Sequence, residues 1–269
     1  MRTASSARSR WGLRTLGLGY LTLLLLAPLA MIFYKTFEHG IAAPLDAITS
    51  PDGLHALKLT LIMIAVAVPL NTVFGVGCAL LLVRHRWKGN PAIDAIINLP
   101  FAISPVVIGL SLFLLYGTNG WLGPTLAEAG IKILFSVPGM ILASVFVSLP
   151  FVVRETVPVL QEIGTDQEQA ASTLGASAWQ IFWRVTLPAI RWGVAYGVVL
   201  TTARVLGEFG AVTIVSGSIS GQTQTLPLFV EKQFEAFNLP GAYGASILLA
   251  VLALSTLLAM NLLKRKEDA

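Results

Sequence analysis

Long runs of uncharged apolar residues most constrain what this chain can fold into. A helix needs about 20 apolar residues to cross a hydrocarbon layer roughly 30 Å thick. Runs of this kind occupy residues 17–34, 59–83, 95–117, 133–153, 192–215 and 236–263, and only Arg204 and Glu208 interrupt the fifth. Charged residues make up 12% of the 269 residues, against about 25% in a typical soluble domain. We therefore expect an all-α polytopic membrane protein with six transmembrane helices.

Several prolines lie inside these runs. Because backbone groups in lipid need hydrogen-bond partners within the segment, the runs are interpreted as helices, with kinks or local breaks at Pro28, Pro69, Pro105 and Pro138. The first run follows several arginines and so is similar to a signal peptide. It is long for the apolar part of a signal peptide and no small-residue cleavage site follows it, so a retained helix is expected.

The distribution of basic residues predicts the orientation. If the N-terminus is cytoplasmic, thirteen of the 18 Lys and Arg residues fall on the inner side, and Lys35, Lys58, Lys132 and Lys232 fall outside. Cytoplasmic loops carry such an excess of positive charge, so both termini are expected in the cytoplasm. The asymmetry also explains the pI of about 9.4 without nucleic-acid binding.

A polar segment, residues 166–188, separates the fourth and fifth runs and is expected in the cytoplasm. Thr165 with Glu168 and Ser177 with Gln180 have the spacing of two capping boxes, which predicts two short helices. Gly175 lies between them as a helix-ending residue.

Two interpretations of this segment stay open from its residues alone. Small and apolar side chains follow one side of the first helix (Ala170, Ala171, Leu174), and large aromatic ones follow the second (Trp179, Phe182, Trp183). The small residues would let another protein's backbone approach closely, with the aromatic residues as anchors. Alternatively, an amphipathic hairpin could lie on the bilayer surface with its tryptophans at headgroup level.

The segment resembles the EAA motif of importer-type (type I) ABC permeases, in which E-A-A is followed by a glycine and then by I-x-L-P. Gln169, Ala170 and Ala171 occupy the first positions, Gly175 the glycine, and Val185, Leu187 and Pro188 the end, all at matching spacing. Gln169 and Val185 depart from the pattern. The neighbouring Glu168 could supply the missing carboxylate one position early, which leaves its polar contact open.

The resemblance implies that the segment is a coupling-helix hairpin that docks onto a separate ATPase subunit. The implied ATPase-coupling residues are Glu168, Gln169, Ala170, Ala171, Leu174, Gly175 and Pro188. The chain has no G-x-x-x-x-G-K-[ST] phosphate loop, so ATP and Mg²⁺ are expected in the partner and no cofactor in this chain. A transport subunit rather than an enzyme is expected.

The fifth run contains two ionisable residues at i,i+4 spacing, Arg204 and Glu208. An arginine near mid-membrane costs about 2.5–3.5 kcal/mol on insertion scales, so this pair should face the bundle interior or a wet path. It could be a structural ion pair that fixes helix packing, or a proton relay. It could also line or gate an anion path, with Arg204 supplying positive charge. The constriction would then be formed by Gly207, Glu208, Phe209 and Gly210.

The strings "VVLTTARVLGEFGAVTIVSGSISGQTQTLPL", "FVVRETVPVL" and "LPFAISPVVIGLSLFLLYG" resemble the sulfate and molybdate branch of these permeases, from about Leu57 to the C-terminus. The resemblance implies sulfate or thiosulfate transport across the inner membrane. The implied partners are a homologous second permease, two ATPase subunits and an extracytoplasmic sulfate-binding protein, besides membrane lipid. The implied organisation is an N-terminal part with the first helix and outer loop (1–56), a five-helix permease core (57–263) and a cytoplasmic tail (264–269).

The outer segment 217–238 carries six neutral hydrogen-bonding side chains that could hold a dianion: Ser218, Ser220, Gln222, Thr223, Gln224 and Thr225. An ordinary solvated loop is the favoured interpretation. Residues 226–237 predict an interfacial or gate-covering helix.

The remaining polar and small residues are weaker indications. Asn71 and Ser104, each near a proline, could face a cavity or serve interhelical packing. Gly75 and Ala79 form a small-xxx-small pair expected at a helix or subunit contact. No metal site is expected, and His39, His55 and His85 are interpreted as solvated loop residues.

Three alternatives to sulfate import remain. A molybdate or tungstate permease shares the G-E-F-G core of the fifth run. An ion-coupled secondary transporter would use Glu208 but predicts internal repeats, and none is clear. A non-transporting scaffold would leave the buried charges without a purpose.

Overall fold

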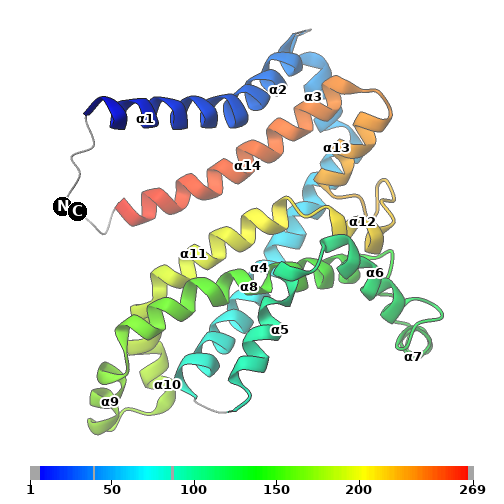
Figure 1. Ribbon diagram of the computed structural model, residues 1–269. Helices are drawn as coiled ribbons and strands as arrows, with labels where there is room; N and C mark the ends of the chain where they lie inside the picture. Colours follow the sequence, from blue (N-terminus) through cyan, green and yellow to red (C-terminus); the bar gives the residue numbers. More distant parts are fainter. Residues whose placement is uncertain (1–6, 39, 86–87, 266–269) are drawn as a thin grey trace.

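The computed structural model describes residues 7–38, 40–85 and 88–265, and this part of the chain is helical with connecting loops and turns (Figure 1). An all-α fold is therefore confirmed. The helices in chain order are α1 (Ala7–Leu21), the π-helix η1 (Thr22–Leu26), α2 (Ala27–Phe37), α3 (Ala42–Thr49), α4 (Pro51–Arg84), α5 (Asn90–Ala102), α6 (Pro105–Tyr116), α7 (Gly123–Glu128), α8 (Val137–Ile163), α9 (Asp166–Thr173), α10 (Ala178–Ile181), the π-helix η2 (Phe182–Thr186), α11 (Leu187–Leu206), α12 (Gly210–Ser216), α13 (Leu226–Glu235) and α14 (Leu239–Arg265).

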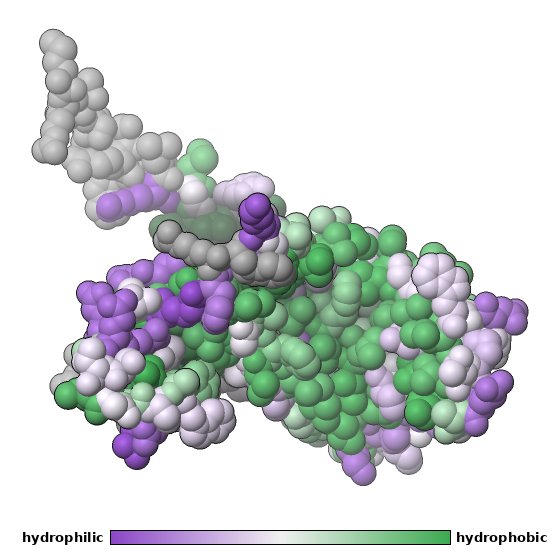
Figure 2. All heavy atoms as spheres, turned by 90° about the horizontal axis from the view of Figure 1, so that it is seen from below, coloured by the Kyte–Doolittle hydropathy of each residue, from purple (hydrophilic) through white to green (hydrophobic). Residues whose placement is uncertain are grey.

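Four helical stretches are long and apolar enough to cross a membrane: Arg14–Phe37, α4, α8 and the Leu239–Leu258 part of α14. Two further pairs pass the same test only together, α5 with α6 and Ala178–Leu206 with α12, and they bend by 110° and 54°. The number of spans is thus four, or up to six if each bent pair counts as one. Figure 2 shows a broad apolar surface with polar residues toward both ends. Exposed side chains such as Val73 and Phe74 suit contact with lipid.

The predicted span over residues 95–117 is broken at Pro105, as expected from the sequence. α5 and α6 meet at a 110° bend, in the region where a break at Pro105 was predicted. Ser104 is extended there (φ −61°, ψ 138°), as the ring of a following proline requires. Arms of 13 and 12 residues are each about 20 Å long at 1.5 Å per residue, shorter than the hydrocarbon layer.

The other prolines act differently. Pro69 lies inside α4, which continues as one 34-residue helix without a break. Pro138 lies in the first turn of α8, where a missing N–H costs nothing, so α8 starts there and runs to Ile163, beyond the predicted end at residue 153. Pro28 follows the π-turn η1, in which the N–H of Ala27 bonds to the carbonyl of Thr22.

Three long helices form the centre of the bundle, with α8 packed against both α4 and α11 (Figure 1). A Cβ atom added at Gly75 of α4 would lie 2.6 Å from Cβ of Val152 in α8. A Cβ atom added at Gly197 of α11 would lie 2.7 Å from Cα of the same Val152. Only glycine fits at either position. Because lipid gives helices little hydrophobic reason to associate, such close backbone approach is what holds them together. The predicted helix contact at Gly75 and Ala79 is confirmed.

A buried hydrogen bond lies four residues before the glycine contact on both helices. Nδ2 of Asn71 in α4 donates to Oγ of Ser148 in α8 at 2.7 Å, and both residues are fully buried. Of the two interpretations of Asn71, interhelical packing is therefore the one that the structure supports. The equal spacing from Asn71 to Gly75 and from Ser148 to Val152 sets a single parallel register.

Gly75→Ala is expected to lower the thermal unfolding midpoint of the detergent-solubilised protein. Forcing a methyl group into this contact costs about 1–3 kcal/mol, which outweighs the up to about 1 kcal/mol that alanine gains over glycine in a helix. The matched control is Gly77→Ala in the same helix, since a Cβ there meets nothing within 4 Å. An unfolding midpoint that rises equally in both variants would contradict the close contact.

Candidate coupling hairpin and buried ion pair

Helices α9 and α10 form a hairpin, residues 165–188, at the end of the bundle between α8 and α11 (Figure 1). Gly175 connects them with φ +85°, in the left-handed region, and a Cβ there would meet nothing within 4 Å. Its N–H bonds to the carbonyl of Ser172 at 3.0 Å. The predicted helix-ending role of Gly175 is confirmed.

One of the two predicted capping boxes is present. Ser177 Oγ accepts the N–H of Gln180, and Gln180 Oε1 accepts the N–H of Ser177 at 2.9 Å. The box predicted for Thr165 and Glu168 is wrong. Thr165 makes no side-chain cap, and its hydroxyl instead accepts Nε2 of Gln169 at 2.9 Å.

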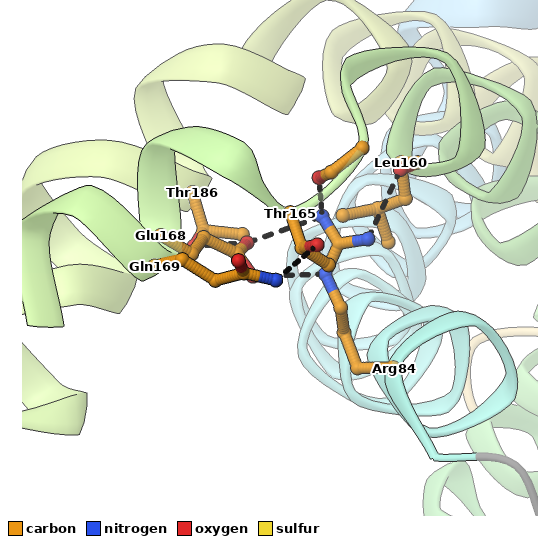
Figure 3. Close-up of polar contacts among 7 residues, drawn as sticks. Arg84, Leu160, Thr165, Glu168, Gln169 and Thr186 are labelled. Atoms are coloured by element: carbon orange, nitrogen blue, oxygen red, sulfur yellow. Dashed lines mark hydrogen bonds and ion pairs between the residues drawn. The ribbon is translucent and has the colours of Figure 1, made fainter.

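The carboxylate of Glu168 is engaged elsewhere, by an arginine 84 residues earlier (Figure 3). Nε of Arg84, the last residue of α4, lies 3.0 Å from Glu168 Oε2, and its Nη2 donates to Oε1 at 3.1 Å. The same guanidinium donates to the carbonyls of Leu160 at 3.2 Å and Gly164 at 2.7 Å. Thr186 of η2 also donates to Glu168 Oε1, at 2.8 Å. Glu168 thus joins α9 to α4 and to η2, and Arg84 in turn bonds to the end of α8.

The sequence analysis missed this role of Arg84 and used the residue only as one of the basic residues that predict the orientation in the membrane. Nothing near Arg84 in the sequence indicates its partner, because the contact depends on the parallel register of α4 and α8. The arrangement also shows how the departure at position 169 is accommodated: Glu168 carries the carboxylate, while Gln169 bonds only to Thr165 among its side-chain contacts.

An open groove on the hairpin is lined by small and apolar residues together with two arginines and a glutamine. Four of the predicted coupling residues, Ala170, Ala171, Leu174 and Pro188, line it together with Gln167, Arg184, Val185, Ala189 and Arg191. Leu174 is 88% exposed and Trp179 is 70% exposed, unusually high for such large apolar side chains. Glu168 and Gln169 do not line the groove. Of the three predicted residues outside the groove, Glu168 bonds inward to Arg84 and Thr186, whereas Gln169 and Gly175 are exposed.

The predicted aromatic group on the second helix is also present. The rings of Trp179, Phe182 and Trp183 pack edge to face or tilted, with centroids 5.3–6.3 Å apart. Such pairs stabilise the local helical turn and hold the exposed tryptophan in place.

The predicted ion pair in the fifth run is present, but its helix is not continuous. Nη1 of Arg204 lies 2.7 Å from Oε2 of Glu208, whose side chain is only 1% exposed. α11 ends at Leu206 and α12 begins at Gly210, with a 54° bend between them. The other oxygen of Glu208 accepts the N–H of Ala211 at 2.9 Å, so this carboxylate caps the start of α12.

The two flanking glycines have different surroundings. A Cβ at Gly210 would lie 3.1 Å from Cβ of Pro105, so this glycine permits the close contact that was predicted. At Gly207 a Cβ would meet only the chain's own Ala203 carbonyl, at 3.6 Å, so no helix approach requires it. Phe209, between them, is 38% exposed. The break in the fifth run therefore lies against the break between α5 and α6.

The outer segment is not an ordinary solvated loop, contrary to the favoured interpretation. Thr223, Gln224 and Thr225 are at most 3% exposed, and the hydroxyl of Thr223 donates to the carbonyl of Ser216 at 2.7 Å. Ser218, Ser220 and Gln222 are the more exposed members of the predicted set. The six side chains therefore do not form one anion-binding ring.

Helix α13 packs against α4 and α14 through its apolar side. Its residues Leu226 and Phe229 are buried against Ala56 of α4 and Ala245 of α14. His55 was expected in a loop but lies in α4, where its Nε2 is 3.2 Å from the carbonyl oxygen of Gln222. His39 lies outside the described residues. Within the described ranges, no three His, Cys, Asp or Glu residues are placed to hold a metal ion.

Comparison with known proteins gives consistent results. The family described as "Binding-protein-dependent transport system inner membrane component" matches residues 71–268. The sulfate transport system permease protein CysW of Synechocystis is 51% identical over 251 residues, 93% of this chain and 91% of the relative. CysW of Escherichia coli K12 is 46% identical over 95% of this chain and 88% of its own length, and CysT of the same organism is 37% identical over 94% and 92%.

Solved structures show the same fold at low sequence identity. A bacterial ABC transporter for import of alginate superposes with a TM-score of 0.80 at 19% identity, covering 95% of this chain and 94% of the other. A second structure, with an alginate-bound periplasmic protein, gives a TM-score of 0.79 at 20% identity over 99% and 98%.

Arg204→Met is expected to destabilise the solubilised protein more than Glu208→Gln does. Removing the arginine leaves a carboxylate buried without its counter-charge, a loss of about 3 kcal/mol or more for buried pairs, whereas glutamine can still accept the Ala211 N–H. The double variant should recover part of the unfolding midpoint lost in Arg204→Met. Strictly additive effects of the two changes would show that the pair is not energetically coupled.

Proposed function

The chain belongs to the family of binding-protein-dependent transport system inner membrane components, and on that premise we propose that it is the permease subunit of an ATP-driven (ABC) importer of sulfate and thiosulfate. The observation that carries this proposal is the 46–51% identity to CysW proteins over most of both chains. A multi-pass membrane protein is consistent with the apolar helices. We place it in the inner membrane with both termini in the cytoplasm, as the basic residues favour.

The proposed partners follow from the same relatives. A homologous CysT-type permease would complete the membrane unit. The 37% identity between this chain and CysT supports the homology of the two permeases. Two CysA-type ATPase subunits would bind ATP and Mg²⁺, which this chain has no phosphate loop to do. An extracytoplasmic sulfate-binding protein would deliver the anion, as the periplasmic protein in the alginate transporter structure suggests by analogy.

The hairpin is the proposed docking site for the ATPase. Its groove offers Ala170 and Ala171, which allow close approach, beside the exposed anchor Leu174. When the two ATPase subunits close on ATP, hairpins docked in this way would move with them as rigid bodies. The attached helices would then rock between inward-facing and outward-facing arrangements.

The proposed translocation path or gate includes Arg204, Gly207, Glu208, Phe209 and Gly210. Irregular backbone at membrane depth is tolerated where it is buried in protein or lines a cavity, and two helix breaks meet at Gly210 and Pro105. Glu208 balances the charge of Arg204. A sulfate ion would therefore meet a polar site without a deep electrostatic well that would trap it.

A molybdate or tungstate permease is the second candidate, because its branch shares the G-E-F-G residues. A competition assay on the assembled complex separates the two. Labelled sulfate uptake into vesicles should be inhibited by sulfate and thiosulfate and much less by molybdate and tungstate. The opposite order would assign the chain to the second candidate.

Uptake by vesicles that contain all four components is expected to require both ATP and the binding protein. Because this chain has no phosphate loop, the proposal requires that the ATPase subunits hydrolyse the ATP that drives uptake. The controls omit one component at a time. Sulfate uptake driven by a proton gradient without ATP would instead support a secondary transporter.

Gly175→Asp is expected to uncouple transport from ATP hydrolysis without impairing membrane insertion. An added side chain and charge at the tip of the hairpin would disturb its docking onto the ATPase. Gly130→Asp is the matched control, because Gly130 also has a positive φ of +71° and open space around it, but lies in the α7–α8 loop. Normal uptake by Gly175→Asp, measured against that control, would count against the docking role.

A further inference from the structure

The hairpin is joined through the chain to α8 and α11, but not to α4. Between α8 and α9 the chain passes through Gly164, whose φ of +64° and ψ of −156° few residues other than glycine adopt. A Cβ at Gly164 would meet nothing within 4 Å, so packing does not hold this joint. By itself the joint would let α9 turn relative to α8, whereas α10 continues through η2 into α11.

Arg84 spans this joint. On one side its guanidinium bonds to the carbonyls of Leu160 and Gly164 at the end of α8, and on the other to the carboxylate of Glu168 in α9. The side chains of Arg84 and Glu168 are only 13% and 20% exposed, so water screens the pair less than a surface ion pair. The planar fork of arginine fixes direction as well as distance, which a lysine would not.

α4 reaches from this clamp to the outer segment. It is one helix of 34 residues, about 50 Å long at 1.5 Å per residue. Near its first turns, Thr60 Oγ1 accepts the N–H of Leu226 at 2.9 Å, and His55 lies 3.2 Å from the carbonyl oxygen of Gln222. One rigid element therefore contacts the hairpin at one end and the outer segment at the other.

We propose that Arg84 is a positioning residue that clamps the hairpin to α4, so that α4 transmits displacement of the hairpin to the outer segment 217–226. This inference rests on the proposed docking of an ATPase at the hairpin. The clamp adds α4 to the two helices that the chain itself connects. All three central helices then move with the ATPase, and Gly164 cannot turn freely.

The test uses the assembled transporter in vesicles and compares Arg84→Gln with Arg154→Gln. Arg154 is the matched control, because it lies in α8, bonds to Asn98 at 2.9 Å and packs on the Phe101 ring, away from the hairpin. Movement of the outer segment is measured with a cysteine at the exposed Ile219, in a Cys78→Ser background, by its labelling rate with a membrane-impermeant maleimide. Uptake per ATP hydrolysed is measured alongside.

With the clamp intact, ATP should change the labelling rate at position 219. We expect Arg84→Gln to abolish that change and to lower sulfate transported per ATP by roughly threefold to tenfold, because a charge-assisted anchor is lost while the exposed groove is kept. Arg154→Gln should leave both readouts near the unmodified level. Glu168→Gln, which keeps the size of the side chain, should reproduce the Arg84→Gln effect.

A labelling response in Arg84→Gln equal to that of the control would overturn the proposal. If the Arg84→Gln protein inserts poorly or in the inverted orientation, Arg84 acts through membrane topology. In that case Glu168→Gln decides, and a normal ATP-dependent labelling response in that variant would also overturn the proposal. Failure of the proposed docking is distinguishable, because Gly175→Asp would in that case transport normally, and failure of the proposed function would leave the unmodified transporter without ATP-dependent sulfate uptake. An uncoupled Gly175→Asp together with an unaffected Arg84→Gln rejects the clamp alone.

Discussion

Val152 of α8 lies against a glycine on each neighbouring helix, Gly75 of α4 and Gly197 of α11. In lipid the apolar surfaces of helices gain little from contact with one another, so close packing and buried hydrogen bonds carry the association. The Asn71–Ser148 bond, four residues away on both α4 and α8, fixes the register of that pair. The same register brings the end of α4 level with the end of α8, where the hairpin begins. The placement of the hairpin therefore depends on this contact.

Each functional region uses a different departure from regular helix. At the hairpin, Gly164 and Gly175 take positive φ values, and long-range polar bonds to Arg84 compensate for the loose joint. In the fifth run the helix stops at Leu206 and restarts at Gly210, and the Glu208 carboxylate satisfies the new helix start while it pairs with Arg204. In both places a charged side chain bonds to backbone groups that the helix leaves free: Arg84 donates to carbonyls at the end of α8, and Glu208 accepts an N–H at the start of α12.

Caps and turns formed by neighbouring residues were predictable from the sequence, whereas polar contacts between distant segments were not. The turn at Gly175 and the capping box of Ser177 follow from residues within a few positions, and the structure has both. The Thr165–Glu168 box has equally good spacing but is absent, because Arg84 offers Glu168 a charged partner and a box offers only a backbone amide. Similarly, the Arg204–Glu208 pair was predictable from its i,i+4 spacing. The helix break between Leu206 and Gly210, where Glu208 lies, was not.

The sequence by itself determined the helical class, most of the spans, and the hairpin with its small and aromatic residues, since these depend on apolar length, local spacing and caps. Only the tertiary structure placed Arg84 on Glu168 and buried Thr223 to Thr225 within the bundle. It also set the 110° angle between the two arms of the 95–117 run, whose break at Pro105 the sequence indicated. The physical reason is that these features arise between segments far apart in the chain, where helix register, and not local propensity, selects the partner of each polar group.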